Sequence, residues 1–345
     1  MRDLYSLSAY LYELPEALIA QHPAEPRDHA RLMVVDRSSG EIRTTIFREL
    51  LQFFHPGDQI IFNDTRVILA RLTGIRSQGG ASELFLTKSH PDGTWNALVK
   101  PGRKLRAGAR IQFEPGFFAE ILDVHPNGER LVRFECTQGS LPELLHKHRK
   151  LPLPHYIKRE AAEKDAESYQ TVYADQEGAL AAPAAGLHFT REMLQALGEK
   201  GVVQTRITLH TGLGTFTPVK SADIREHVMH REQALVAPDA AEQLNRHKTA
   251  PLNLCVGTTC CRTLETAASE GGVVSPGEYE TGIFIYPGYR FKYVKQLLTN
   301  FHAPGSTLLM LVSAFAGYEL IQEAYQRAIK ERFRFLSYGD AMLIL

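Results

Sequence analysis

The chain has 345 residues, and its 39 basic and 39 acidic side chains leave no formal net charge. A balanced charge argues against a protein that is coated with nucleic acid over its whole surface, although local basic faces remain possible. A hydrophobic fraction of 44% is ordinary for a globular protein with a sizeable core, and the length predicts two domains.

The longest apolar run, at residues 307–317, is far shorter than the roughly 20 residues that cross a membrane. We therefore expect a buried core segment there. The N-terminal stretch contains Asp3, Glu13 and Glu16 and no apolar signal-peptide run. The four cysteines form no CxxC pair, so we expect free thiols in a cytoplasmic protein.

The first predicted strand, 57–65, ends at Asn63 and Asp64. The pattern then changes to short β-rich runs separated by turn residues, at 83–88, 94–99, 109–114, 118–124 and 129–135. Five strands at this spacing predict a small antiparallel barrel or sandwich. A short helix at 141–148 and a proline-rich hinge at 151–157 are expected to follow it.

Strands and helices alternate in the rest of the chain. We expect strands at 202–210, 252–257 and 280–287, and helices at 190–201, 239–248, 261–271 and 317–333. The predicted fold class is α/β, with a large discontinuous domain (1–71 and 151–345) whose helices pack on a mostly parallel sheet. The β-barrel-like domain (72–150) is expected to be inserted into it.

Five segments gather glycine, histidine and polar residues in loops or at predicted strand ends, where α/β proteins place their sites. They are 62–72, 181–190, 208–219, 256–267, and the pair 299–307 with 335–345. For each segment an ordinary turn, a core histidine or a plain helix cap remains an open alternative.

The second and the third of these segments each bring a histidine to a loop. His188 lies among small residues just before Thr190, which can cap the next helix. Gly212-Leu213-Gly214 lacks the GxGxxG fingerprint, but this loop can bring His210 and backbone amides to a substrate.

In the fourth segment, Thr258 and Thr259 can cap a helix that carries Arg262, and such an N-terminus suits a carboxylate. In the fifth, His302 and Asp340 stand between apolar flanks, and structural hydrogen bonds are an adequate explanation for both.

Two stretches suggest RNA binding. Residues 100–110 hold five basic side chains and no acidic one, and residues 286–295 interleave tyrosine and phenylalanine with Arg290, Lys292 and Lys295. Cations contact phosphates, and aromatic rings stack on unpaired bases. A solvated charged loop is the alternative. His227 and His230 have helical spacing but no companion ligands, so we expect no metal site.

Taken together, the segments resemble the S-adenosylmethionine:tRNA ribosyltransferase-isomerase family of queuosine biosynthesis. The resemblance runs from YELPEALIAQHPAEPRDHARL to YGDAMLI. Between them lie, in the family's order, FNDTRVILARL, LPLPHYI, YQTVYA, AAPAAGLHFT, TLHTGLGTF, HVMH, VGTT, IFIYPGY, TNFH and STLLMLVSAFAG. The chain departs from the family at Leu69, Ala184, Thr211 and Cys260, where proline, threonine, valine and serine are usual.

The resemblance implies a large α/β domain with an inserted β-barrel-like domain. It also implies a transferase that moves the ribosyl part of S-adenosylmethionine to the aminomethyl group of a 7-deazaguanine at the wobble position of tRNA. Epoxyqueuosine forms in the tRNA, and adenine and methionine leave. We expect a cytoplasmic monomer that binds the anticodon arm of tRNA and uses S-adenosylmethionine as co-substrate, with no permanently bound cofactor, metal or membrane.

The sulfonium acidifies the adjacent ribosyl carbon, and histidine is suited to the proton transfers that follow. Our hypothesis assigns these transfers to His188 and His210, oriented by Asp64 or Asp340. Further residues are expected to bind the substrates. Those for S-adenosylmethionine are Thr258, Thr259, Arg262, Gly212 and Gly214, and those for tRNA are Lys100, Arg103, Lys104, Arg106, Arg290 and Lys292.

Three other functions remain open from the sequence. A methyltransferase would use the same donor but leave S-adenosylhomocysteine, and the missing glycine-rich fingerprint counts against it. A non-catalytic RNA-binding protein would need only the basic and aromatic stretches. A metallohydrolase built on His227 and His230 is the third alternative.

Overall fold

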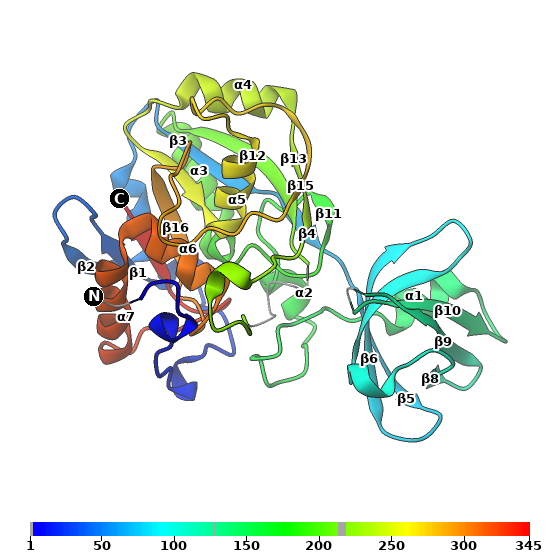
Figure 1. The fold of residues 1–345 in the computed structure, drawn as a ribbon. Helices are drawn as coiled ribbons and strands as arrows, with labels where there is room; N and C mark the ends of the chain where they lie inside the picture. The colour runs from blue at the N-terminus through cyan, green and yellow to red at the C-terminus, as the bar shows by residue number, and fades with distance from the viewer. Residues whose placement is uncertain (1–2, 127, 213–218) are drawn as a thin grey trace. The chain divides into compact units, whose positions relative to one another are not determined.

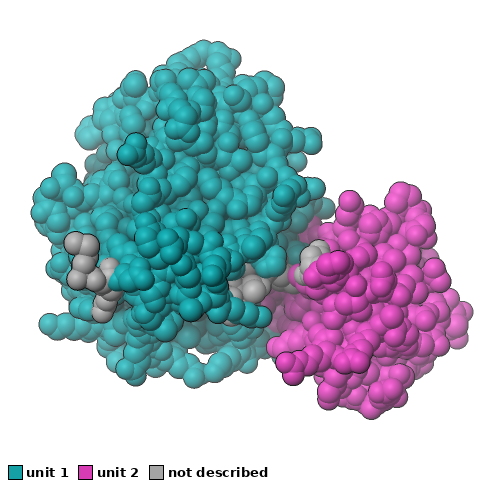
Figure 2. All heavy atoms as spheres, in the orientation of Figure 1, with its two compact units in different colours: residues 1–66, 154–160, 166–345 teal, residues 67–153, 161–165 magenta. Residues whose placement is uncertain are grey.

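The structure is a computed structural model, and it describes residues 3–126, 128–212 and 219–345. The chain forms two compact units, drawn in different colours in Figure 2. The α/β unit contains residues 1–66, 154–160 and 166–345, and the barrel unit contains residues 67–153 and 161–165. The predicted insertion at 72–150 lies within the longer segment of the barrel unit.

The α/β unit is built on one large sheet (Figure 1). Its strands, in spatial order, are β15 (Gly277–Thr281), β13 (Glu232–Val236), β12 (Val203–His210), β3 (Gln59–Asn63), β14 (Asn253–Val256), β16 (Gln296–Asn300), β17 (Ala341–Ile344), β1 (Arg31–Val35) and β2 (Ile42–Ile46). The central strands β12, β3, β14 and β16 are parallel neighbours, and β17 is parallel to β1.

Pairing is antiparallel elsewhere, between β16 and β17, between β1 and β2, and along β12, β13 and β15. The predicted α/β class is confirmed, but the sheet is mixed and parallel mainly at its centre. The strands that make it mixed, β1, β2, β13, β15 and β17, have only four or five residues each.

Helices cover both faces of this sheet, because alternate residues of each strand point to opposite sides. The helices are η4 (Phe47–Phe53), α3 (Arg191–Glu199), α4 (Pro238–His247), α5 (Gly257–Ala267), α6 (Thr307–Ala316) and α7 (Tyr318–Lys330). Met33 and Val35 of β1 join the core under α4–α7, whereas Leu32 and Val34 join the core under α3 and η4.

Shorter elements complete the α/β unit. They are η1 (Leu7–Tyr10), η2 (Glu16–Leu18), η3 (Arg27–His29), β4 (Thr65–Val67), α2 (Asp165–Ser168), β11 (Gln176–Ala179), η6 (Ala184–His188) and η8 (Ile224–Glu226). The last residue of β4 and the first residue of α2 belong to the barrel unit. Along the described residues, no helix combines the length and the apolar character that crossing a membrane requires.

Several local predictions can be compared with these elements. Thr190 caps α3 as predicted, since its side chain accepts a hydrogen bond from the Met193 amide. The predicted core segment 307–317 is α6, and most of its side chains are buried. The strand predicted at 280–287 is wrong beyond Thr281, where β15 ends and irregular backbone follows.

The barrel unit is a closed antiparallel barrel with the order β10, β7, β6, β5, β8, β9. The strands are β5 (Arg71–Arg76), β6 (Ala81–Ser89), β7 (Trp95–Lys100), β8 (Arg110–Glu114), β9 (Phe117–Val124) and β10 (Arg130–Cys136), with η5 (Gly102–Lys104) and α1 (Leu141–His148). The predicted barrel and its short helix are confirmed. Strand β5 was missed because polar residues and Gly74 interrupt its apolar pattern.

Candidate functional site

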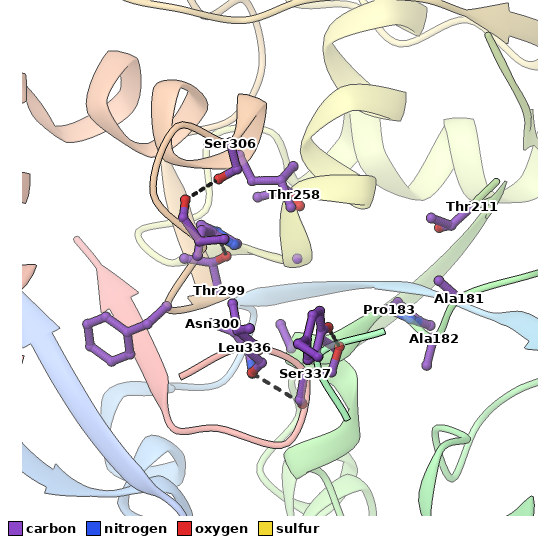
Figure 3. A pocket seen from close by; sticks show the side chains of 18 of the residues that line it. Ala181, Ala182, Pro183, Thr211, Thr258, Thr299, Asn300, Ser306, Leu336 and Ser337 are labelled. Carbon is purple, nitrogen blue, oxygen red and sulfur yellow. Dashed lines mark hydrogen bonds between the residues drawn. The ribbon is translucent and has the colours of Figure 1, made fainter. Parts of the chain in front are cut away.

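The α/β unit contains a cavity of about 480 Å³ (Figure 3). Its wall comes from segments that are far apart in the sequence, chiefly residues 181–185, 257–259 and 299–304, together with Thr211 and Ser337. Four of the five segments singled out from the sequence therefore meet here. A cavity of this size is typical of sites for small ligands.

The order of the sheet explains this convergence. The parallel strands β12, β3, β14 and β16 end at the same edge. Thr211 directly follows β12, Gly257 directly follows β14, and Phe301 directly follows β16. In open α/β sheets, ligands bind at the carboxyl ends of such strands.

Helix α5 begins at the wall of the cavity, one residue after β14 ends. The turn between them needs Gly257, whose φ of +89° lies in the left-handed region. Val256 occupies the cap position and supplies no side-chain hydrogen bond. The prediction that Thr258 and Thr259 cap this helix is wrong, because both lie inside its first turn.

Another wall of the cavity contains a buried histidine, His302. Its Nε2 lies 2.9 Å from the Thr299 hydroxyl, and its carbonyl accepts a hydrogen bond from the hydroxyl of Tyr12. Burial lowers the pKa of His302 to about 3, so the imidazole is neutral at physiological pH. Structural hydrogen bonds were an adequate explanation for His302 from the sequence, but the residue also lines the cavity.

Asp64 directly follows β3, and His210 is the last residue of the neighbouring strand β12, so the two lie close together. The Asp64 carboxylate accepts a hydrogen bond from the Thr208 hydroxyl at 2.7 Å, and burial raises the pKa of Asp64. His210 Nδ1 is 2.8 Å from the Thr65 hydroxyl. Burial lowers the pKa of His210, and the charge of Asp64 opposes that change.

Neither Asp64 nor His210 lines the cavity, but both adjoin it. The Asn63 side chain donates hydrogen bonds to the Leu209 carbonyl and, at 3.2 Å, to the hydroxyl of Thr259 in the cavity wall. The residue that follows His210 is Thr211, whose hydroxyl is buried and has no hydrogen-bond partner among the described residues. The structure thus brings this predicted pair to the edge of the cavity.

His188 is buried at the end of η6, whose first two residues line the cavity. Its ring lies 4.9 Å from that of Phe47, and burial lowers its pKa to about 4. The charge of Asp340 opposes this shift, so the two side chains interact. Asp340 itself accepts hydrogen bonds from the Arg31 and Arg334 amides and pairs with the Arg334 guanidinium, which are structural contacts.

Arg262 does not line the cavity. Its buried guanidinium forms an ion pair with Glu232, and Glu232 also accepts a hydrogen bond from the Gly212 amide at 3.1 Å. The positive charge expected to hold a carboxylate is therefore already neutralised. Gly214 lies outside the described residues.

Four of the predicted RNA-binding residues, Lys100, Arg103, Lys104 and Arg106, are exposed on the barrel unit. In the α/β unit, Arg290 is exposed, but the Lys292 ammonium donates to the Ala268 carbonyl.

The predicted histidine pair lies in a loop, where His227 packs edge-on against Phe284. Across the described residues, no group of three or more histidine, cysteine or carboxylate side chains is arranged to hold a metal ion.

The sequence pattern singled out neither His155 nor Tyr156, which form another part of the wall. The Tyr156 and Ser337 hydroxyls are 2.6 Å apart, although 181 residues separate them in the chain. The sequence of the segment 151–157 predicts a hinge and contributes to the family resemblance, but it predicts no site residue. A histidine and a tyrosine beside its prolines were the available signal.

Comparison with known proteins identifies the family. A family model described as "Queuosine biosynthesis protein" matches residues 7–344. Two proteins named S-adenosylmethionine:tRNA ribosyltransferase-isomerase, from Symbiobacterium thermophilum and Desulfitobacterium hafniense, are 52% and 50% identical to the chain. Each alignment covers 98% of this chain and 99% of the relative.

A crystal structure of S-adenosylmethionine tRNA ribosyltransferase from Thermotoga maritima is also similar. It matches with a TM-score of 0.55 and 35% identity, covering 98% of this chain and 100% of that one. The resemblance that the motifs indicated is therefore confirmed, and the chain belongs to the queuosine biosynthesis protein family.

Proposed function

We propose that the cavity in the α/β unit binds S-adenosylmethionine and that the enzyme transfers the donor's ribosyl group to tRNA. The chain is a transferase of queuosine biosynthesis, as the names of its full-length relatives state. In the proposed reaction the ribosyl group is isomerised on the 7-aminomethyl-7-deazaguanine wobble base. Epoxyqueuosine forms in the tRNA, and adenine and methionine are released.

Two features of the cavity wall support this use: its small side chains and a buried polar group that has no hydrogen-bond partner among the described residues. Ala181, Ala182 and Ala184 leave room for a ligand, while the buried Thr211 hydroxyl has no partner among the described residues. A buried polar group without a partner is costly in a folded protein. A bound ligand with several polar atoms would satisfy it.

We propose that His210 and Asp64 carry protons for the reaction. A base must remove a proton from the ribosyl carbon next to the sulfonium, and the leaving adenine must gain one. Burial lowers the pKa of His210, which favours the neutral imidazole that can accept a proton, and burial raises the pKa of Asp64 toward neutral pH. His188 is a second proposed proton acceptor, and the charge of Asp340 acts on its ring.

Binding of the donor is proposed to use the first turn of α5, with Thr258 and Thr259, and the loop that starts at Gly212 and includes Gly214. Arg262 is proposed to act indirectly, because its ion pair with Glu232 connects α5 to the Gly212 amide. This ion pair has a structural role, because it links α5, which begins in the cavity wall, to Gly212, which follows Thr211 of the wall.

The tRNA is proposed to bind through its anticodon arm, because the modified base lies in the anticodon. Lys100, Arg103, Lys104 and Arg106 on the barrel unit and Arg290 on the α/β unit are the proposed phosphate contacts, together with Lys292. The enzyme is proposed to act as a monomer. A tRNA substrate supports a cytoplasmic location.

The decisive experiment incubates the enzyme with labelled S-adenosylmethionine and tRNA that carries the 7-aminomethyl-7-deazaguanine base. Mass spectrometry of the digested tRNA should show the mass of an epoxycyclopentanediol addition, with adenine and methionine released in equal amounts. A gain of a methyl group with S-adenosylhomocysteine would instead support a methyltransferase.

A further inference from the structure

We propose that the methionine carboxylate of the donor is held between the first turn of α5 and the loop that leads into α6. Thr258 and His302 supply its side-chain hydrogen bonds, and no cationic side chain takes part. This inference rests on the proposed function, since it assigns one end of the cavity to one part of S-adenosylmethionine.

The first observation is the open N-terminus of α5. The first amides of any helix have no acceptor within the helix, so a side chain or a ligand usually binds them. Here Val256 occupies the cap position and offers no acceptor, and Gly257 and Thr258 are buried in the cavity wall. The positive end of the helix dipole at this place favours an anion.

The second observation is independent of α5 and concerns His302. This residue lies between β16 and α6, and its side chain is buried, with a relative exposure of 8%. Nε2 is bonded to Thr299, but Nδ1 has no hydrogen-bond partner within the described part of the chain. When the Thr299 hydroxyl donates to Nε2, Nδ1 carries the proton and can donate to a ligand in the cavity.

Thr258 adds a third donor at the same cavity. It is 7% exposed, and its hydroxyl has no partner within the described part of the chain. In the view of Figure 3, Thr258 lies on the same side of the cavity as Ser306, which caps α6 through the Leu309 amide. Ser337 lies on the other side in this view.

The charge of the lining explains why a carboxylate with its own ammonium group fits. No aspartate, glutamate, lysine or arginine is among the described residues that line the cavity. Residues 213–218, which follow Gly212, are also uncharged in sequence. The amino-acid end of the donor is a zwitterion without net charge of its own, so it needs no charged side chain in this lining, and the dipole of α5 favours its negative end.

The test compares S-adenosylmethionine with its decarboxylated form in the wild type and in the variants Thr258→Val and His302→Phe. The tRNA substrate is present throughout, and kcat/KM is measured from adenine release. We expect each variant to lose about tenfold or more with S-adenosylmethionine and much less with the decarboxylated donor, because a charge-assisted hydrogen bond is lost only where a carboxylate exists. Thr258→Ser and His302→Asn, which retain a donor, should recover part of the loss.

Ser337→Ala is the matched control, since it removes a hydroxyl from another part of the same wall. It should change kcat/KM for both donors by the same factor. If wild-type enzyme does not turn over the decarboxylated donor, its inhibition constant against S-adenosylmethionine replaces kcat/KM in the same comparison.

The outcomes separate this inference from the proposed function. If Thr258→Val and His302→Phe affect both donors equally, the carboxylate site is wrong even though the enzyme still transfers the ribosyl group. If the wild type releases no adenine from S-adenosylmethionine in the presence of the tRNA substrate, the proposed function itself is wrong.

Discussion

Arg262 and Glu232 form an ion pair in the interior of the α/β unit, and their side chains are only 6% and 5% exposed. Breaking a buried pair by removing one charge leaves the other without compensation, which typically costs about 3–5 kcal/mol. We therefore expect Glu232→Gln to lower the free energy of unfolding by about that amount, measured by urea denaturation.

The neighbouring pair Arg231–Glu280 provides the control, because its side chains are 72% and 60% exposed. Solvent screens such a pair, so Glu280→Gln should change the free energy of unfolding by less than about 1 kcal/mol. Equal effects of the two substitutions would show that burial of the Arg262–Glu232 pair is not important for stability.

His188 makes the stability of the protein depend on pH. Its pKa is lowered from 6.5 to about 4 by burial, so at pH 5 the unfolded chain binds a proton that the folded protein does not. The stability is therefore fully present above pH 6.5 and is lost as the pH falls toward 4, by about 3 kcal/mol in total. His188→Gln should weaken this dependence when urea denaturation is compared at pH 7.5 and 4.5.

His302, whose pKa is lowered to about 3, contributes a dependence of the same sign, so the His188→Gln variant should retain part of it. His29→Gln, at an exposed position of the same unit, is the control and should leave the slope of stability against pH unchanged. The prediction is wrong if His188→Gln, like the control, keeps the slope of the wild type.

How much could be predicted from the sequence is clear at α5. Periodicity located a helix at 261–271, but the helix begins four residues earlier, at Gly257. The chain passes from β14 into α5 through one glycine with positive φ, which leaves no loop for a sequence pattern to detect. Local signals succeeded where the contact itself was local, as in the Thr190 cap of α3.

The composition of the cavity could not be predicted in the same way. Thr211, Gly257 and His302 are brought together by the order of parallel strands in the sheet, and no spacing along the chain encodes that order. His188 illustrates the limit for single side chains. Its small neighbours in sequence left a functional and a core histidine both open, and packing against Phe47, far away in sequence, buries the ring.

Ala184 tests where the donor binds. It lines the cavity and is half-buried, so a larger side chain there can extend into the empty space without displacing the core. We expect Ala184→Leu to raise the KM for S-adenosylmethionine by about tenfold, with a nearly unchanged melting temperature. Ala184→Thr, the smaller substitution, should raise it much less, and an unchanged KM in the leucine variant would place the donor elsewhere.

The basic residues of the barrel unit should contribute to tRNA binding through phosphate contacts. Arg103 and Arg106 are exposed and form no ion pair within the described residues, whereas Arg110 pairs with Glu135. Replacing both Arg103 and Arg106 with alanine should weaken tRNA binding and reduce the slope of log affinity against log salt by about 2. Arg110→Ala should have a smaller effect, and an unchanged slope in the double variant would exclude phosphate contacts here.

Asp64 and His210 can be tested through the pH dependence of the reaction. Burial lowers the pKa of His210, and the negative charge of Asp64 partly offsets that effect. Asp64→Asn removes the charge, so the His210 pKa should fall further and the neutral imidazole should persist to lower pH. If His210 acts as a base, the acid limb of kcat/KM against pH should therefore move to lower pH in Asp64→Asn, although the maximal rate decreases.

The variant His210→Gln separates this role from a structural one. It can still form a hydrogen bond near Thr65 but cannot accept a proton, so the acid limb should lose the contribution of this residue.

Thr208→Val removes the hydrogen bond that lowers the pKa of Asp64 without removing its carboxyl group. It should shift the profile in the same direction as Asp64→Asn, because a carboxyl group with a higher pKa is charged less often beside His210. A shift toward higher pH in either Asp64→Asn or Thr208→Val would contradict the assignment of His210 as the base.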